Sequence, residues 1–599
     1  MTDEMKKYLI AIITILFPVF SACDMLDKTP LDTMSPDAFF KTETDLQLFS
    51  NTFYNNLLDK SPFDEQSDQL IEDVLSDALI GGTKRTVPKT STAWDWVDLR
   101  KMNTLLELAP EQCEDPAALV KYTALTRFFR AYFYYEKVKR YGDVPWYDKQ
   151  LGSADPDLYK PRDSRELVMQ NMIKDIDYAI ENLPSEPSVY RANRWAALAL
   201  KSRFCLFEGT YRKYHGLTLE GNGYEYYLNQ AAEAAEEILR DGPYKLYNTG
   251  DPEKDYLNLF TAEDANTDEY ILALKFDYGL AIHHNGTAYT IVETQGCPGF
   301  TKKIIDSYLM KDGSRYTDRQ GWATMEFKDE MADRDPRLAQ TIRSTGYIRI
   351  GTSTVQAPDF TRCVTGYHPI KFTQEPSASG GQVDRNDRST NDLPVFRLGE
   401  VMLNYAEAKA ELGDIDQSDL DISINKLRDR AGMPDLVLSD ANGNADWYLQ
   451  SEEYGYPNVT GPDEGVILEI RRERTIELAM EGFRYFDLMR WAAGDCIDQE
   501  MYGMYFDGPG EYDLTGDGKP DICLYEGAKP ATEASASFQI GKEIFLSEGS
   551  RGYVTPAGTS QRQGFNPARD YLYPIPSDER SLTNGALAQN PGWNDGLEF

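Results

Sequence analysis

The sequence is poor in histidine and lacks the short motifs of the common catalytic sites. Only four of its 599 residues are histidine, and the His-Glu-x-x-His motif of zinc proteases is absent. There is also no Gly-x-Ser-x-Gly elbow and no phosphate-binding loop that ends in Gly-Lys-Ser/Thr. Since none of these patterns indicates catalysis, we expect that the protein is not an enzyme.

Basic residues are scarce in comparison with acidic residues. The chain has 62 Lys and Arg against 98 Asp and Glu, which gives a net charge of -36 at pH 7. A surface with this charge repels nucleic-acid phosphates and anionic lipid head groups. The composition therefore argues against nucleic acid as a partner.

Hydrophobic runs long enough to cross a membrane are missing, and the longest run lies near the start of the chain. Lys6 and Lys7 precede an apolar run from Tyr8 to Phe20, and Ser21-Ala22-Cys23 follows it. The run is shorter than the roughly 20 residues of a transmembrane helix, and the layout is typical of a bacterial lipoprotein signal. We predict a signal peptide over residues 1–22 and lipidation of Cys23, whose acyl chains would anchor the protein to a membrane.

Cysteine patterns of metal sites are absent as well. The chain has seven cysteines, and none belongs to a Cys-x-x-Cys pair or lies beside a group of histidines. This disfavours structural zinc and thioredoxin-type chemistry. The spacing selects no disulfide pairs among the cysteines that follow Cys23, namely Cys113, Cys205, Cys297, Cys363, Cys496 and Cys523.

Helical patterns dominate the first 240 residues and return between about 394 and 495. Arg194 to Gly209, followed by Tyr226 to Arg240, has the small and large apolar residues of a helix, a turn and a helix, and resembles a tetratricopeptide unit. The same layout recurs in Val395 to Gly413 with Asp416 to Gly432. Two looser pairs precede them, 36–58 (with Ser35 as N-cap) with 94–110, and 117–141 with 164–183. Four such pairs would stack into a curved solenoid, and an ordinary irregular helical domain is the alternative.

Gly, Pro, Asn and Asp interrupt the helical patterns elsewhere. We therefore predict a mostly α fold in one domain over residues 23–599. The helical solenoid would cover about 35–245 and 394–495, a loop-rich ligand-binding insertion about 246–393, and a loop-rich C-terminal part 496–599. Short strands would lie within the loop-rich parts.

Three glutamates at four-residue spacing suggest a network of ion pairs. Glu473, Glu477 and Glu481 would share one helical face, where like charges repel, so cationic partners are expected. The candidates are Arg474, Arg484 and Arg490 nearby, or Arg130 and Arg397 from other helices. The alternative is a pair of catalytic acids about 5 to 9 Å apart across a cleft. We favour the structural role, because ion-pair networks perturb carboxylates without chemistry.

An acidic, glycine-rich stretch has the oxygen spacing of a cation-binding loop. Asp513, Thr515, Asp517 and Asp521 place oxygen side chains around two glycines, and calcium is the natural ion for such a set. The stretch is not an EF-hand, since Leu524 stands where the bidentate Glu would be. A structural calcium site and a solvated acidic turn remain equal alternatives, and no cofactor is required.

Aromatic residues are plentiful, with 38 Tyr, 26 Phe and 8 Trp. Most of them should pack between helices, but those in loops can stack on sugar rings. The candidates for ligand contact are Trp94 and Trp96 ahead of a helix, Tyr289 beside Asn285, and Trp322.

An ordered set of segments resembles the SusD/RagB family. The segments are Phe128 to Tyr132, Arg140 to Trp146, Asp312-Gly313, Asp335 to Leu338, Arg397 to Gly413 and Ile470 to Trp491, with Tyr571 to Trp593 at the end. The resemblance implies four tetratricopeptide-like pairs in a right-handed superhelix, in an outer-membrane lipoprotein that faces the outside of the cell. It also implies a function: the protein would bind oligosaccharides and cover a partner TonB-dependent transporter of the SusC type. Peptide binding is an alternative within the same family, and a surface glycoside hydrolase is a third hypothesis.

Overall fold

The structure is a computed structural model that describes residues 39–599. The predicted signal peptide, Cys23 and the predicted N-cap Ser35 lie outside the described residues. Within residues 39–599, no helix has the length and apolar character needed to cross a membrane.

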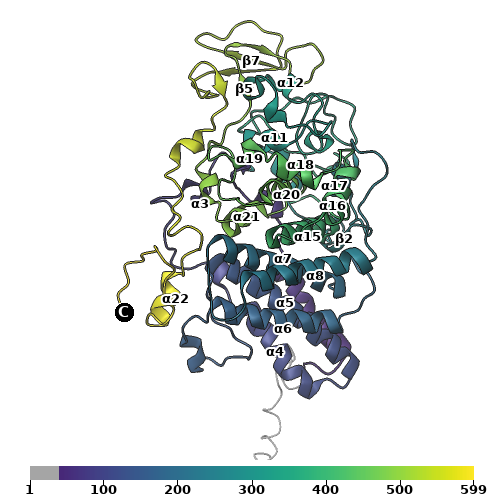
Figure 1. Cartoon of the computed structure of the whole chain (residues 1–599), viewed down its shortest axis with the longest axis vertical. Coiled ribbons are helices and arrows are strands. Elements are labelled where there is room, and N and C mark those ends of the chain that lie inside the picture. Colours follow the sequence, from purple (N-terminus) through teal and green to yellow (C-terminus); the bar gives the residue numbers. More distant parts are fainter. Residues whose placement is uncertain (1–38) are drawn as a thin grey trace, which may run out of the picture.

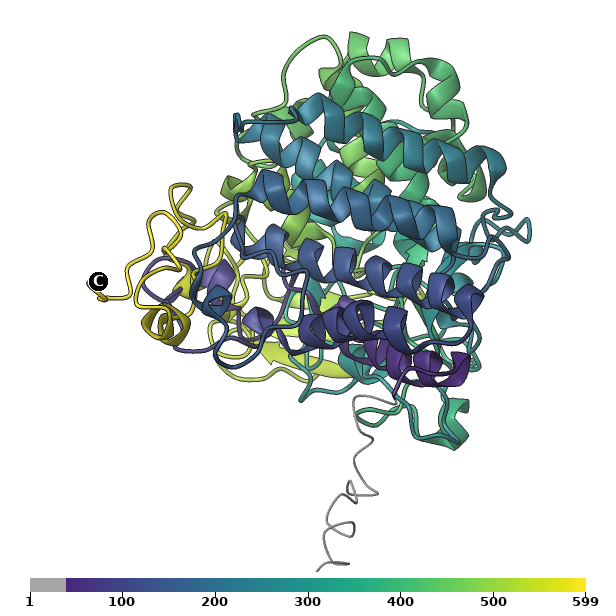
Figure 2. The same ribbon diagram turned by 90° about the horizontal axis from the view of Figure 1, so that it is seen from below.

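Long helices form one half of the molecule and lie side by side in chain order (Figures 1 and 2). Each contacts the next along the chain from α4 onward, and α2 packs on α5 and α4. Their bounds are α2 Glu43–Leu57, α4 Val97–Gln112, α5 Pro116–Tyr141, α6 Arg165–Asn182, α7 Arg194–Tyr214 and α8 Tyr224–Asp241. The three predicted helix pairs of this region therefore exist, and the closely packed small residues of α7 and α8 explain their long contact.

Local sequence explains where these helices start and stop. Asp115 caps the start of α5 by accepting the amides of Ala117 and Ala118, and Pro116 occupies the first helical position. Gly142, with φ +70°, ends that helix. Helix α2 begins later than predicted, because Thr42 forms a capping box with Asp45 and starts the helix at Glu43.

The fourth predicted pair is only half correct. Helix α15 (Leu398–Leu412) packs on α8 and on α20 (Glu464–Glu477), as a further helix of the same stack. The predicted single helix over 416–432 is wrong, because the chain forms two short helices instead, α16 (Gln417–Asp421) and α17 (Ile424–Arg430). Ser423 breaks the helix between them with φ -128° and ψ -92°.

The other half of the molecule is rich in loops, with short helices and short strands, as expected (Figure 1). The short helices are α3 Asp77–Ile80, α9 Asp255–Thr261, α10 Gly286–Ile291, α11 Lys302–Ser307, α12 Phe327–Glu330, α13 Pro336–Ala339, α14 Ala378–Gly381, α18 Leu438–Gly443, α19 Trp447–Gln450, α21 Arg484–Arg490 and α22 Ser577–Leu582. Several of them cover the buried helix α20, which thus lies between the long helices and the loops.

The strands form small separate sheets. β1 (Leu70–Ile71) pairs with β3 (Gly299–Phe300), β2 (Tyr270–Leu274) with β4 (Leu393–Arg397), and β5 (Tyr505–Phe506) with β9 (Gly552–Tyr553), all antiparallel. β7 (Ile522–Tyr525) lies between antiparallel β6 (Gly510–Tyr512) and parallel β8 (Ala536–Gln539). The β2–β4 pair joins the insertion to the start of α15, so that it fixes the insertion against the helical half.

A buried network of ion pairs surrounds the end of α20, and we call it the glutamate network. Glu477 contacts Arg430 at 2.6 Å, Arg397 at 2.8 Å and Arg337 at 3.4 Å. Glu473 contacts Arg428 at 2.6 Å, and Glu481 contacts Lys371 at 2.6 Å and Arg397 at 2.7 Å. Burial would raise the pKa of these glutamates, but the adjoining cations outweigh it and hold all three pKa values below the ordinary range.

The network confirms ion pairing but corrects the expected partners. Of the predicted cations only Arg397 pairs with any of the three glutamates, namely with Glu477 and Glu481. Arg474 pairs instead with Asp487, Arg484 with Asp68, Arg490 with Glu407, and Arg130 with Asp175. Glu481 does not share the helical face, since α20 ends at Glu477 and Met480 turns the chain with φ +60°. Each of the three buried carboxylates pairs with at least two cations, which fits the expected structural role.

The contact between α18 and α20 depends on a glycine. A Cβ atom on Gly465 would lie 1.9 Å from the carbonyl oxygen of Ala441. We expect Gly465→Ala to lower the free energy of unfolding by about 1–3 kcal/mol, since the two helices would have to separate. Gly443→Ala is the matched control on α18, because its Cβ would meet no atom within 4 Å. Equal urea midpoints for the two variants would contradict the expectation.

Candidate functional site

Trp94 and Trp96 lie just before α4 and are held there by a lysine of α5. The ammonium of Lys137 donates hydrogen bonds to the carbonyls of Ala93 (2.6 Å) and Asp95 (2.7 Å). Burial lowers the pKa of Lys137 to about 8. The two indole rings meet edge to face with their centroids 5.4 Å apart, so the pair forms one rigid aromatic unit.

A small cavity of about 180 Å³ lies beside this pair. Trp96 and Tyr147 line it with rings 5.7 Å apart, and Asn103 lies in its wall. Asn103 already donates to the carbonyl of Tyr147 at 2.9 Å and accepts from Arg130 at 3.0 Å. Ligand pockets usually measure about 300–1,000 Å³, so this cavity suits a single small group better than an extended chain of sugars.

Asn285 and Tyr289 lie elsewhere, at the start of α10. Tyr289 is 4% exposed, its hydroxyl donates to Glu72 at 2.9 Å, and its ring packs beside Phe63. Asn285 donates to Gln295 and accepts the amide of Asp387 at 3.0 Å. Packing and hydrogen bonding within the chain thus occupy both side chains, and their contact with a ligand stays a prediction.

Trp322 lies in a third place and belongs to a group of aromatic rings at the surface. Its ring meets those of Trp447, Tyr448 and Tyr454 edge to face at 6.1, 5.6 and 5.9 Å. Tyr448 and Tyr454 stack on each other at 4.7 Å. We call Trp322, Trp447, Tyr448 and Tyr454 the aromatic platform. It combines the short turn at 322–324 with α19, which Figure 1 places in the half away from α4.

The aromatic platform is accessible and has polar neighbours. Trp447 is 43% exposed, which makes it the most exposed tryptophan of residues 39–599, and Trp322 and Tyr454 are half-buried. The indole nitrogen of Trp447 donates to Asp318 at 2.9 Å, which fixes the ring at the surface. Asp318 is itself exposed, and so is Gln320, which precedes Trp322 by two residues in the chain. Flat apolar faces next to amide and carboxylate groups are what a sugar ring requires, because it has one C–H face and a rim of hydroxyls.

No motif in the sequence marks Trp447, Tyr448 or Tyr454 as ligand residues. Most aromatic residues in a mostly helical chain pack in its core, and Tyr448 is indeed buried. The available signal was the high density of aromatic residues between 447 and 456 next to an acidic stretch. The five predicted ligand residues thus lie in three separate places: Trp94 with Trp96, Asn285 with Tyr289, and Trp322 in the aromatic platform.

The predicted calcium ligands form the turn between β6 and β7. Asp513 accepts the amides of Gly516 (2.6 Å) and Gly518 (2.9 Å), and Asp521 accepts those of Leu514 and Thr515 at 2.8 Å each. Within residues 39–599, no three His, Cys, Asp or Glu side chains are grouped so that they could hold a metal ion. These hydrogen bonds fit an acidic turn, and calcium at Asp513, Thr515, Asp517 and Asp521 stays a prediction.

Comparison with known proteins assigns the family. A family model described as the SusD family matches residues 274–593, which is more than half of the chain. The chain belongs to the SusD family. A second model, described as "Starch-binding associating with outer membrane", matches residues 83–206 in the helical half.

Relatives of this SusD-family chain extend over nearly its whole length. SusD-like protein P2 of Formosa agariphila is 22% identical and covers 98% of this chain and 100% of its own. A SusD-like protein of Bacteroides fragilis has a structure with a TM-score of 0.65 at 22% identity, over 94% of this chain and 100% of its own. A SusD-like carbohydrate-binding protein of the same species has a TM-score of 0.63 at 20% identity, over 91% and 99%. The mostly α, SusD-like fold predicted from the sequence is therefore confirmed.

Proposed function

We propose that this protein is an outer-membrane lipoprotein that binds oligosaccharides at the cell surface and delivers them to a partner TonB-dependent transporter of the SusC type. The observation that carries the proposal is the aromatic platform, which presents Trp447 to solvent beside Asp318 and Gln320. Stacking on aromatic faces explains how such a surface would hold successive sugars.

Two comparisons support a glycan as the ligand. One matching family model is described as starch-binding, and one structural relative is a carbohydrate-binding protein. The predicted lipoprotein signal at residues 1–22 with Cys23 supports a lipid anchor. The second family model, whose description includes association with the outer membrane, supports that membrane as the location. The net charge of -36 disfavours any attachment of the folded part to anionic lipids, which leaves the lipid anchor as the attachment.

The proposed role is binding without catalysis. The acids of the glutamate network, which were the best candidates for general acid–base work, are buried and saturated by arginines. The net charge of -36 favours solubility of the folded part.

Calorimetry with a broad panel of oligosaccharides tests the proposal on protein that lacks residues 1–23. We expect saturable binding of at least one glycan and no release of reducing sugar. If no glycan binds but peptides from a mixed pool do, the ligand is a peptide and not an oligosaccharide. Hydrolysis of a bound glycan would instead establish a surface glycosidase.

The transporter part of the proposal has its own test. Purification of the full chain from native outer membranes in mild detergent should recover a large barrel protein in stoichiometric amount. A Cys23→Ala variant is the matched control, because it would lose the anchor and leave the membrane fraction. Recovery of the chain alone from membranes would refute the partnership.

A further inference from the structure

A second and much larger cavity lies inside the molecule, between the long helices and the loop-rich half. Its volume is about 690 Å³, within the usual range for ligand sites. Helices α5 and α7 form one wall, β4 with the start of α15 a second, and the segment that leads into α21 a third. The exposed side chains of Asn55 and Asn56, in the last turn of α2, and of Asp59 and Lys60, just after it, stand at its rim.

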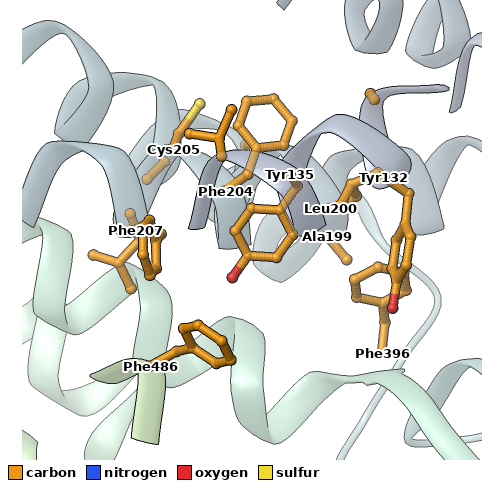
Figure 3. Close-up of a cluster of buried hydrophobic side chains, with 14 of the residues drawn as sticks. Tyr132, Tyr135, Ala199, Leu200, Phe204, Cys205, Phe207, Phe396 and Phe486 are labelled. Atoms are coloured by element: carbon orange, nitrogen blue, oxygen red, sulfur yellow. The ribbon is translucent and has the colours of Figure 1, made fainter. Parts of the chain in front are cut away.

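Two tyrosines of α5 direct free hydroxyl groups into this cavity. Tyr132 and Tyr135 line it and are only 6% and 8% exposed. Figure 3 shows both rings extending from α5 toward the space next to Phe396 and Phe486. Among residues 39–599, neither hydroxyl has a hydrogen-bond partner, and neither oxygen is fully enclosed by protein atoms, so both open into the cavity. Two hydroxyls that open into one space without a partner in the chain are available to bind a polar ligand.

The ionic groups of the wall are mostly paired with each other. Arg203 binds Glu400 at 2.6 Å, and Arg474 binds Asp487 at 2.7 Å. Lys139 pairs with Glu136 at 2.7 Å. The walls therefore present no large excess of either sign, so an ion of high charge has no counter-charge to bind.

Arg140 and Glu65 are half-buried exceptions in this wall, and the exposed Asp59 and Lys60 at the rim likewise form no ion pair within the described residues. Within the described part of the chain the Arg140 guanidinium forms no ion pair and contacts only the rings of Phe486 (5.2 Å) and Tyr573 (5.5 Å). Glu65 accepts one hydrogen bond, from the amide of Tyr485 at 3.3 Å. Burial raises the pKa of Glu65 to about 7, so the carboxyl group can both donate and accept near neutral pH.

We propose that this cavity, which Tyr132, Tyr135, Arg140 and Glu65 line, is a second binding site that takes a neutral, hydroxyl-rich ligand of one or two sugar units. Two phenols, a carboxyl and a guanidinium supply donors and acceptors for the hydroxyls, and Phe207 and Phe486 supply apolar faces. The site is distinct from the aromatic platform, with which it shares no residue.

Removal of the two hydroxyls tests the site without disturbing the fold. The full chain in detergent micelles is titrated by calorimetry with common monosaccharides and disaccharides, chosen by saturation-transfer NMR. We expect at least one to bind, and we expect Tyr132→Phe with Tyr135→Phe to weaken it about tenfold or more, since each lost hydrogen bond weakens binding. The unfolding midpoint should not fall, because no hydrogen bond within the described chain is lost.

Tyr134→Phe is the matched control on the same helix. Tyr134 does not line the cavity, and its hydroxyl accepts the amide of Tyr147 at 2.6 Å. This variant should lower the unfolding midpoint and leave the affinity unchanged, the reverse of the double variant.

The remaining outcomes separate this site from the proposed function. A Trp447→Ala variant should still bind the small sugar in the cavity. Absence of glycan binding at the aromatic platform would therefore not change the outcome of this test. Binding of no small sugar, or equal affinity in the double Tyr variant and the wild type, would overturn the second site. Tighter binding of free amino acids than of sugars would overturn its ligand class, because Arg140 and Glu65 would then hold a zwitterion.

Discussion

Replacement of Glu477 by glutamine is expected to lower the free energy of unfolding by about 3–5 kcal/mol, one of the largest effects of a single change in this chain. Glu477 is completely buried and contacts Arg430, Arg397 and Arg337. A neutral amide leaves these guanidinium groups with too little negative charge, in a place where water cannot solvate them. Urea unfolding followed by circular dichroism measures the change.

The exposed ion pair of Arg240 with Asp241 provides the control. Its partners are 2.7 Å apart, but both side chains are more than half exposed. Asp241→Asn should leave the urea midpoint unchanged, since water screens such pairs. A change at Glu477 no larger than that at Asp241 would show that the glutamate network does not stabilise the fold.

The same variant has a defined pH dependence. In the wild type, the surrounding arginines hold the pKa of Glu477 in the folded state below its ordinary value. The stabilisation by Glu477 is therefore complete above the pKa of the unfolded state, about 4.3, and is lost as the pH falls through the pKa of the folded state. The stability difference between wild type and Glu477→Gln should therefore stay constant from about pH 6 to 8 and shrink below about pH 4. A difference that grows with acid would contradict this sign.

Replacement of Trp447 by alanine should weaken binding of the preferred glycan by roughly 30-fold or more, equivalent to about 2 kcal/mol. Trp447 is the most exposed ring of the aromatic platform, and its truncation also removes the edge-to-face neighbour of Trp322. The expected loss lies in the dissociation rate, because the stacked contact forms only after encounter. Calorimetry and surface plasmon resonance with the same glycan measure the affinity and the rates.

Tyr226→Ala on α8 is the matched control for this prediction. Tyr226 is an aromatic residue of similar exposure, at 37%, on the long-helix half of the molecule. Its removal should change neither affinity nor rates, and both variants should remain folded at the temperature of the binding measurement. If Trp447→Ala binds as tightly as Tyr226→Ala, the platform is not the glycan site, and the cavity beside Trp94 and Trp96 becomes the next candidate.

The sequence alone determined the features that depend on neighbours along the chain. Apolar periodicity and local caps located the helices over 117–141, 164–183 and 194–209, since a helix start needs only a side chain two or three residues away. The ordered motifs were sufficient to identify the family, and the spacing of three glutamates showed that cations must surround them.

Tertiary structure decided everything that depends on distant segments. Arg337 and Arg430 reach Glu477 from 140 and 47 residues away, so no local spacing could identify them as partners in place of Arg474. Trp447 looks like a core residue in the sequence, and only its position against Trp322 shows an exposed platform. The unpaired hydroxyls of Tyr132 and Tyr135 likewise result from three distant segments that enclose one cavity without filling it. A sequence pattern indicates which face of a helix is buried, but it does not indicate which segments pack against that face.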